Sequence, residues 1–150
     1  MKSAPALCLI AALTSLAASS LAQEGPIKYR QGVMNAIGGH AGAIAQISYG
    51  GVGHRSHLTA HADAMESLTK MVVTAFEQNA KPTADVPSRA KEEIWKDFSD
   101  FKSKTDALVK AAADYAATAR AGKTDMLAAK LDPLWDACKG CHKKFRAKEK

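Results

Sequence analysis

Near its C-terminal end the chain carries two cysteines and a histidine at a spacing that can attach a haem. The motif is Cys138-Lys139-Gly140-Cys141-His142, in a chain of 150 residues with three cysteines. Cys-x-x-Cys followed directly by His is the pattern in which two thioether bonds hold a haem and the histidine binds its iron. We therefore predict one covalent haem c, attached through Cys138 and Cys141, with His142 as an axial iron ligand.

Disulfide oxidoreductases offer an alternative reading of the same cysteine pair, because they also use Cys-x-x-Cys. Their motif opens a helix near the start of a βαβ unit. This pair instead lies close to the C-terminus, with no strand pattern around it. The histidine that follows the second cysteine also favours haem attachment.

The first residues have the form of an export signal. A positively charged start is followed by an apolar stretch over 4–18, and small residues then lead to Ala22. We predict a signal peptide at 1–22, cleaved after Ala22, and one mature domain at 23–150 in the periplasm. Cleavage would also remove Cys8. The apolar stretch is shorter than the roughly 18 to 20 residues that span a bilayer, and no later segment is apolar enough. No stable membrane insertion is therefore expected after cleavage.

The net charge is +6, and basic residues crowd the last part of the chain. Those in the last twelve positions are Lys139, Lys143, Lys144, Arg146, Lys148 and Lys150. Nucleic acid is not expected as a partner, because an exported protein without aromatic residues interleaved in its basic face lacks that signature. A basic rim beside a redox centre would instead attract acidic redox proteins. A solubilising helix end, whose lysines complement the helix dipole, explains the same residues.

Apolar residues recur at helical spacing through the rest of the chain. Helices are expected at about 26–49 and 56–79. A third should follow the N-cap Ser88 and end at Gly122, and a fourth should follow a cap at Thr124 or Asp125. Pro133 either kinks this last helix or delays its start to Asp132. The expected inward residues are Ile27, Met34, Ile37, Ala41, Ile44, Ser48, Leu58, Met65, Leu68, Val72, Phe76, Ile94, Phe98, Phe101, Leu108, Tyr115, Leu127, Leu131, Leu134, Cys138 and Phe145. Short connections between such helices predict an all-α fold, an antiparallel up-and-down four-helix bundle with covalently bound haem c.

The haem motif is expected on the buried face of the last helix. Spacings of three and four place Cys138, Cys141, His142 and Phe145 on one side. The apolar stripes of the other helices would then close over the porphyrin. Keeping water away from the iron disfavours the ferric state and raises the reduction potential.

Three segments resemble a known family. They are similar to motifs of class II c-type cytochromes, the cytochrome c-prime superfamily. The segments are the run from Cys138 to Arg146, the run Lys28-Tyr29-Arg30-Gln31-Gly32-Val33-Met34, and Ile94-Trp95 followed by Phe98 and Phe101. The resemblance covers the whole expected mature chain and is strongest for the low-spin, methionine-ligated branch of c-556 type. It implies that a homodimer can form through the first two helices, where small Ala41, Ala43 and Ala45 allow close approach.

Met34 decides which activity the resemblance implies. It matches the distal position of the first helix, where low-spin members carry a methionine ligand. A second axial ligand at Met34 implies a single-electron carrier that catalyses no bond chemistry. The alternative is a five-coordinate, high-spin member that binds nitric oxide or carbon monoxide for sensing or detoxification. By periodicity alone, Met34 fits apolar packing as well as ligation. The other methionines expected in the mature domain are Met65, Met71 and Met126, each better explained by core or surface packing.

Two arginines complete the site implied by the resemblance. Arg30 lies one helical turn before Met34 and would contact a haem propionate. Arg146 follows His142 by four residues and would cover the proximal face of the haem. A surface position explains either arginine equally simply.

Four histidines lie outside this site. His54, His57 and His61 fall at spacings of three and four on one face, and such an array can bind zinc or copper. An exposed, polar helix start explains the same pattern. His40 is similar in position to a histidine of the family, and no ligand role is assigned to it.

Overall fold

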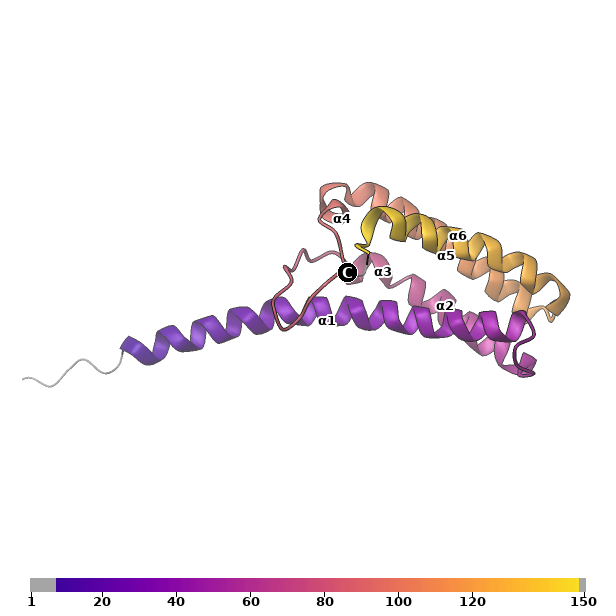
Figure 1. Cartoon of the computed structure of the whole chain (residues 1–150), viewed down its shortest axis with the longest axis horizontal. Coiled ribbons are helices and arrows are strands. Elements are labelled where there is room, and N and C mark those ends of the chain that lie inside the picture. The colour runs from indigo at the N-terminus through magenta and orange to yellow at the C-terminus, as the bar shows by residue number, and fades with distance from the viewer. Residues whose placement is uncertain (1–7, 149–150) are drawn as a thin grey trace, which may run out of the picture.

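The computed structural model describes residues 8–148, and these are mostly helical, with an irregular segment over 76–92 (Figure 1). The elements are α1 (Cys8–Ser48), η1 (Arg55–His57), α2 (Leu58–Thr69), α3 (Val72–Ala75), α4 (Glu93–Lys96), α5 (Phe98–Arg120), η2 (Thr124–Met126) and α6 (Leu127–Phe145). In Figure 1, α1 and α2 run along one side of the bundle, and α5 and α6 along the other. The predicted all-α four-helix bundle is confirmed, with α2 and α3 together supplying its second helix.

The first helix begins earlier than predicted. It was expected from Pro26, whereas α1 starts at Cys8 and continues through Pro26. Proline removes one backbone hydrogen bond, but the Ala- and Leu-rich stretch before it has high helix propensity, which favours continuation. In Figure 1 the early part of α1 extends beyond the other helices. Within the predicted signal peptide, residues 1–7 lie outside the described part of the chain, and 8–22 form the start of α1.

The second predicted helix is interrupted. The expected span was 56–79, but α2 ends at Thr69 and α3 covers only Val72–Ala75. The hydroxyl of buried Thr69 donates to the carbonyl of Glu66, and that of Thr74 donates to the carbonyl of Met71. Such back-bonding and the β-branched run after Met71 both weaken a helix.

The predicted caps of the last two helices are wrong. Ser88 does not start a helix; its hydroxyl accepts bonds from the backbone nitrogen of Ala90 and from Arg30. The N-cap of α5 is Asp97, whose carboxylate accepts from the backbone nitrogen of Asp100 at 3.1 Å. Neither Thr124 nor Asp125 caps α6: its N-cap is Met126, which makes no side-chain cap bond, and the helix continues through Pro133.

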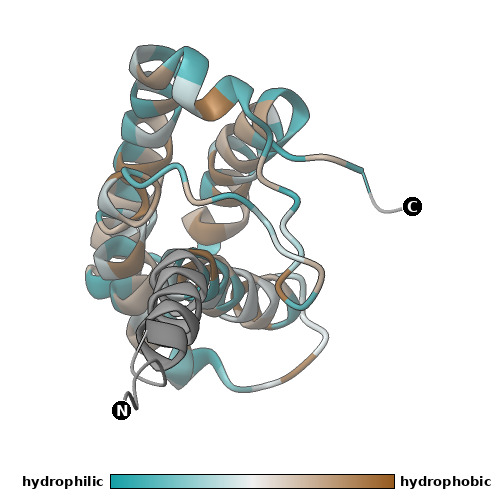
Figure 2. Ribbon diagram, turned by 90° about the vertical axis from the view of Figure 1, so that its left-hand side faces the viewer, coloured by the Kyte–Doolittle hydropathy of each residue, from teal (hydrophilic) through white to brown (hydrophobic). Residues whose placement is uncertain are grey.

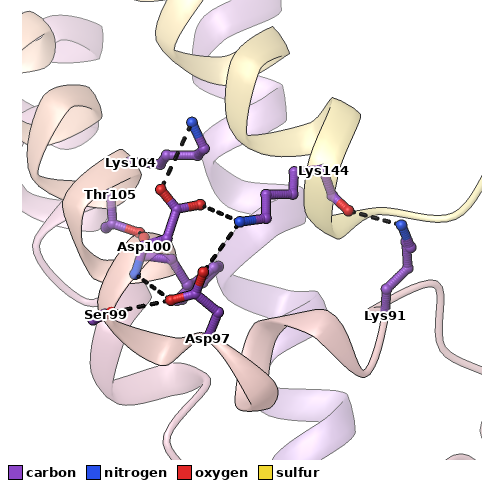
Figure 3. Close-up of polar contacts among 8 residues, drawn as sticks. Lys91, Asp97, Ser99, Asp100, Lys104, Thr105 and Lys144 are labelled. Atoms are coloured by element: carbon purple, nitrogen blue, oxygen red, sulfur yellow. Dashed lines mark hydrogen bonds and ion pairs between the residues drawn. The ribbon is translucent and has the colours of Figure 1, made fainter.

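The Asp97 cap also joins α5 to the end of α6. Figure 3 shows the ammonium group of Lys144 between Asp97 and Asp100, at 3.2 and 2.8 Å. Ser99 donates a further hydrogen bond to Asp97 at 3.0 Å. The turn that follows His142 is thereby tied to the start of α5.

Replacing Asp97 tests this cap, and the expected effect depends on pH. Bonds from the backbone of Asp100, from Ser99 and from Lys144 hold the pKa of Asp97 below its usual range. The carboxylate therefore stabilises the fold above an unfolded pKa of about 3.9, and that contribution is lost as pH falls through the lower native pKa. Asp97→Ala should lower the thermal midpoint at pH 7 more than Asp97→Asn, which keeps a capping oxygen. Thermal unfolding from pH 7 down to pH 3 should show the deficit of the Ala variant shrinking. Equal midpoints for both variants at pH 7 would contradict the capping role.

The core follows the predicted inward stripes. Figure 2 shows apolar residues, in brown, along the helices, where they alternate with hydrophilic residues. Most predicted inward residues are buried, while Met34, Ser48, Leu68, Phe98 and Cys138 are half-buried. Gly50 and Gly122 follow α1 and α5 with φ of 79° and 67°, a backbone conformation that glycine adopts readily. Within the described residues, every helix is too short or too polar to cross a bilayer.

Candidate functional site

The cysteine and histidine motif lies in the last two turns of α6. Cys138, Cys141 and His142 are all half-buried on the face that ends in buried Phe145. No disulfide bond joins the two cysteines. Burial raises the pKa of Cys138, and it raises the pKa of Cys141 to about 11. A disulfide oxidoreductase needs a lowered thiol pKa at a helix start, so this environment argues against that alternative.

A cavity of about 920 Å³ opens against this face of α6. All six residues predicted for the site line it, namely Arg30, Met34, Cys138, Cys141, His142 and Arg146. The first two come from α1, and the others come from α6 and the residue after it. The cavity has a volume typical of sites that enclose a ligand of substantial size.

The walls of the cavity are mostly apolar. They are formed by Ile37, Ala41, Val72, Phe76, Ile94, Phe101, Leu108, Trp135 and Phe145. Phe101 is the centre of an aromatic group, with ring centroids 5.2 Å from Phe76 and 5.4 Å from Phe145. These side chains form an apolar surface that would suit the faces of a porphyrin and would keep water from its iron.

Met34 and His142 reach the cavity from different helices. Met34 is half-buried on α1, whereas His142 lies on α6, on the other side of the bundle (Figure 1). Burial lowers the pKa of His142, and the nearby charges of Arg146 and Arg89 lower it further. A neutral imidazole is the form that binds a metal.

The other described methionines lie elsewhere. Met65 is buried in the core, 1% exposed, and does not line the cavity. Met71 and Met126 are 42% and 47% exposed. Among the described residues, Met34 is thus the methionine that lines the cavity.

Arg30 is a buried cation in the cavity wall. Its side chain is 2% exposed, and its guanidinium lies 5.0 Å from the Trp95 ring centroid. It donates to the carbonyls of Gln78 and Ala80 at 3.4 and 3.1 Å, and to the hydroxyl of Ser88 at 3.3 Å.

The guanidinium of Arg30 keeps one donor unused. Its Nε is buried without a hydrogen-bond partner, and burial lowers the pKa of the side chain. Burying a charged group with an unpaired hydrogen-bond donor costs free energy unless an anion accepts that hydrogen bond and balances the charge. The residues present therefore fit a ligand that carries a carboxylate into the cavity, as a haem propionate would.

Arg146 lies at the edge of the cavity rather than inside it. Its side chain is exposed, and its backbone nitrogen donates to the carbonyl of His142 at 3.0 Å. It forms an isolated antiparallel bridge with Ala90, and the backbone nitrogen of Ala147 donates to the carbonyl of Arg89 at 2.8 Å. The segment before α4 is thus joined to the end of the haem-motif helix.

Several cavity residues were not predicted from the sequence, among them Trp135 and Arg89. Trp135 precedes Cys138 by three residues, so helical spacing could have identified it. Trp95 does not line the cavity, but its indole nitrogen donates to the carbonyl of Phe76 at 2.7 Å and its ring packs on the cavity residue Arg30. Arg89 belongs to an irregular segment, where no periodic signal places it at the cavity.

The predicted array of three histidines does not converge. His54 stacks on His57 with ring centroids 5.1 Å apart, whereas His61 contacts His40 on α1. Within residues 8–148, no three His, Cys, Asp or Glu side chains are arranged to hold a metal ion.

Comparison with known proteins agrees with this architecture. The sequence model of the Cytochrome C' family matches residues 25–146. A cytochrome c' of Rhodospirillum rubrum is 30% identical over 94% of this chain and 97% of its own length. A cytochrome c-556 of Agrobacterium tumefaciens is 32% identical over 83% of this chain and 99% of its own.

Solved structures show the same arrangement of helices. The nitric oxide complex of a mutant cytochrome c prime from Alcaligenes xylosoxidans superposes with a TM-score of 0.75 and 26% identity, covering 85% of this chain and 97% of that one. Relatives under both names, cytochrome c' and cytochrome c-556, thus span nearly their full length on this chain. The match to the family model, together with the cavity against the Cys-x-x-Cys-His helix, shows that the chain belongs to the cytochrome c' family and is a monohaem c-type cytochrome.

Proposed function

We propose that this cytochrome carries single electrons in the periplasm through a low-spin haem. In this proposal, Cys138 and Cys141 form the thioether bonds, and His142 and Met34 are the axial ligands. The haem supplies the reversible one-electron change between ferrous and ferric iron. The observation that carries the proposal is the position of Met34, in the wall of the cavity that His142 also lines.

The residues around the haem would favour its reduced form. Met34 offers a thioether, which prefers ferrous iron and raises the potential. The apolar walls exclude water, so an added charge on the iron is less well solvated. Filling both axial positions with protein ligands also limits rearrangement during electron transfer, as a carrier requires. We expect no bond chemistry on a substrate.

Arg30 and Arg146 would have different tasks in this site. The buried guanidinium of Arg30, with its unpaired Nε, would hold a haem propionate. Arg146 is exposed beside His142 and would cover the edge of the proximal side. Its charge also helps to keep the imidazole of His142 neutral.

The second candidate function is binding of a diatomic gas. It is favoured by the similarity to a cytochrome c prime whose structure contains nitric oxide. It requires Met34 to pack against the core without binding iron, which leaves an axial position free. Met34 does contact the hydrophobic core, so its surroundings suit either role.

An optical spectrum of the reduced protein, with and without carbon monoxide, separates the two functions. An electron carrier with both axial positions filled should show a low-spin spectrum that changes little with carbon monoxide. A broad high-spin Soret band that shifts readily on adding the gas would contradict ligation by Met34 and support gas binding. Acid–acetone extraction of the same sample should leave the haem on the polypeptide if the thioether bonds form.

We further propose that the redox partner presents an acidic surface to the rim of the cavity. Among the described residues the cavity lining contains no carboxylate, and its basic side chains include Arg30, Lys139 and Arg146. Two propionates would neutralise only part of this charge. Lys144 is paired with Asp97 and Asp100 and contributes little net charge.

Reversing one rim charge should change electron exchange with small charged reagents. Lys139→Glu is expected to slow oxidation by ferricyanide roughly 5- to 10-fold at low ionic strength, and added salt should remove the effect. The same variant should speed oxidation by a cationic cobalt(III) complex. Lys110→Glu is the matched control, since Lys110 is exposed on α5 and does not line the cavity. Equal effects of the two substitutions on stopped-flow rates would contradict a docking role for this rim.

A homodimer through α1 and α2 remains a prediction. Of the three small residues expected to allow close approach, Ala41 is buried in the core and lines the haem cavity, so it is not available to a partner. Ala43 and Ala45 are half-buried. Exposed Tyr29 lies on α1, and exposed Met71 lies between α2 and α3.

A further inference from the structure

Two histidines from different helices meet outside the haem cavity. His40 lies on α1 and His61 on α2, and their Nδ1 atoms are 2.9 Å apart. The ring centroids are 5.2 Å apart, with the rings inclined at 60°. Both side chains are half-buried, and neither lines the cavity. The function proposed above gives this pair no role.

The contact requires nitrogen atoms in the form that binds metals. One Nδ1 must donate a proton and the other must offer a lone pair, so at least one ring is neutral. Burial lowers the pKa of His61, and the neighbouring charges of His40 and His57 lower it further. A shift of the donated proton from Nδ1 to Nε2 would give both rings an Nδ1 lone pair without any change in net charge.

The separation of the two nitrogens indicates which metal fits. Metal–imidazole bonds of about 2.0–2.1 Å place two ligand nitrogens about 2.9 Å apart at a right angle, and about 3.3 Å apart at a tetrahedral angle. The observed 2.9 Å is the length of the hydrogen bond between the rings, and it equals the right-angle spacing, so an ion with this preference would replace the shared proton without separating the two nitrogens. Right-angle coordination by nitrogen is the preference of divalent copper, which also binds such ligands most strongly among the common divalent ions.

We propose that His40 and His61 form a two-histidine binding site for Cu²⁺, with water completing the coordination. Binding requires both rings to rotate, so that the two Nδ1 lone pairs converge on one ion instead of one nitrogen facing the other. Two protein ligands are consistent with the absence of a preformed three-ligand group within residues 8–148. Bound copper would also link α1 to α2 across their packing interface.

Titration of the ferric, haem-loaded protein with Cu²⁺ alone tests the site. Calorimetry should show one bound ion per chain, and Zn²⁺ should bind more weakly. Electron paramagnetic resonance should give a tetragonal copper signal with nitrogen couplings, distinct from the haem signals. Removing a residue that only hydrogen-bonds to a metal ligand weakens metal binding by about 10–100-fold. Because His40 and His61 are the proposed ligands themselves, His40→Gln or His61→Gln should weaken copper binding by roughly 10-fold or more.

His54→Gln is the control, because His54 stacks on His57 and does not contact the pair. It should leave copper affinity unchanged. Glutamine keeps a hydrogen-bonding group at each position, and an unaltered Soret band and far-ultraviolet spectrum would show that each variant folds. Copper binding that is unaffected by both His40→Gln and His61→Gln, a signal without nitrogen couplings, or no stoichiometric binding would overturn the proposal.

Discussion

Met34→Leu is expected to convert a low-spin haem into a high-spin one that binds carbon monoxide. Leucine has a volume close to that of methionine, so the packing of α1 should survive. It has no sulfur, however, and an axial position of the iron becomes free. If Met34 leaves the iron in only about 1% of molecules, its removal should raise the apparent affinity for carbon monoxide about 100-fold. The reduction potential should fall, because the thioether no longer favours ferrous iron.

The measurements are the reduced optical spectrum and its titration with carbon monoxide. Met71→Leu is the matched control, since Met71 is 42% exposed and does not line the cavity. It should leave the spectrum and the affinity unchanged. A Met34→Leu protein with the spectrum of the unaltered protein would show that Met34 is a packing residue, and the gas-binding function would then be favoured.

The parts of the fold that could be predicted are those with an uninterrupted helical pattern. The apolar face of α6 continues through Cys138, Cys141 and His142, so spacing alone placed the motif against the core. The position of Met34 on α1 followed from periodicity, but its functional role followed only from resemblance. Met34 and His142 line one cavity because each lies on a regular helix that packs against it.

The predictions that were wrong concern places where local and tertiary effects compete. The apolar residues Val72 and Phe76 continue the stripe of α2, yet the hydroxyl of Thr69 and the β-branched residues after it interrupt the helix. Ser88 has the residue type of an N-cap, but Arg30 and the backbone of Ala90 bind its hydroxyl instead. Arg30 lies more than fifty residues from Ser88 in the sequence, so a local pattern cannot reveal this contact.

Arg30 shows the same limit at the site itself. Helical spacing places it one turn before Met34, which suggests a common face. Its burial and its bonds to the segment before α4 depend on how that segment folds back across α1. The unpaired Nε, which supports a propionate partner, is a property of the assembled fold alone.

Replacing Arg30 is expected to change both stability and reduction potential. Arg30→Met removes the donors that the carbonyls of Gln78 and Ala80 accept, and hydrogen bonds to charged groups contribute about 1.5–3 kcal/mol each. Removing a buried charge also removes its desolvation cost, and this offsets part of the lost free energy of unfolding. We expect a net loss of about 2–3 kcal/mol in the free energy of unfolding of the haem-loaded protein, measured with urea. The potential should fall, since a positive charge near the haem disfavours the ferric state.

Arg30→Lys separates the two effects, because lysine keeps the charge but not the planar fork of donors. Arg30→Lys should keep a reduction potential close to that of the unaltered protein, but it should lose most of the stability that Arg30 contributes. Arg120→Gln is the control for removing an arginine, since exposed Arg120 pairs with Asp63 and Glu66 on the surface. Surface pairs are screened by solvent, so its effect on unfolding should be much smaller and its effect on the potential negligible. If Arg30→Met and Arg30→Lys lower the potential equally, the charge does not act on the haem, and Arg30 only secures the segment before α4. If the potential falls in Arg30→Met alone, the charge of Arg30 acts on the iron, as pairing with a propionate requires.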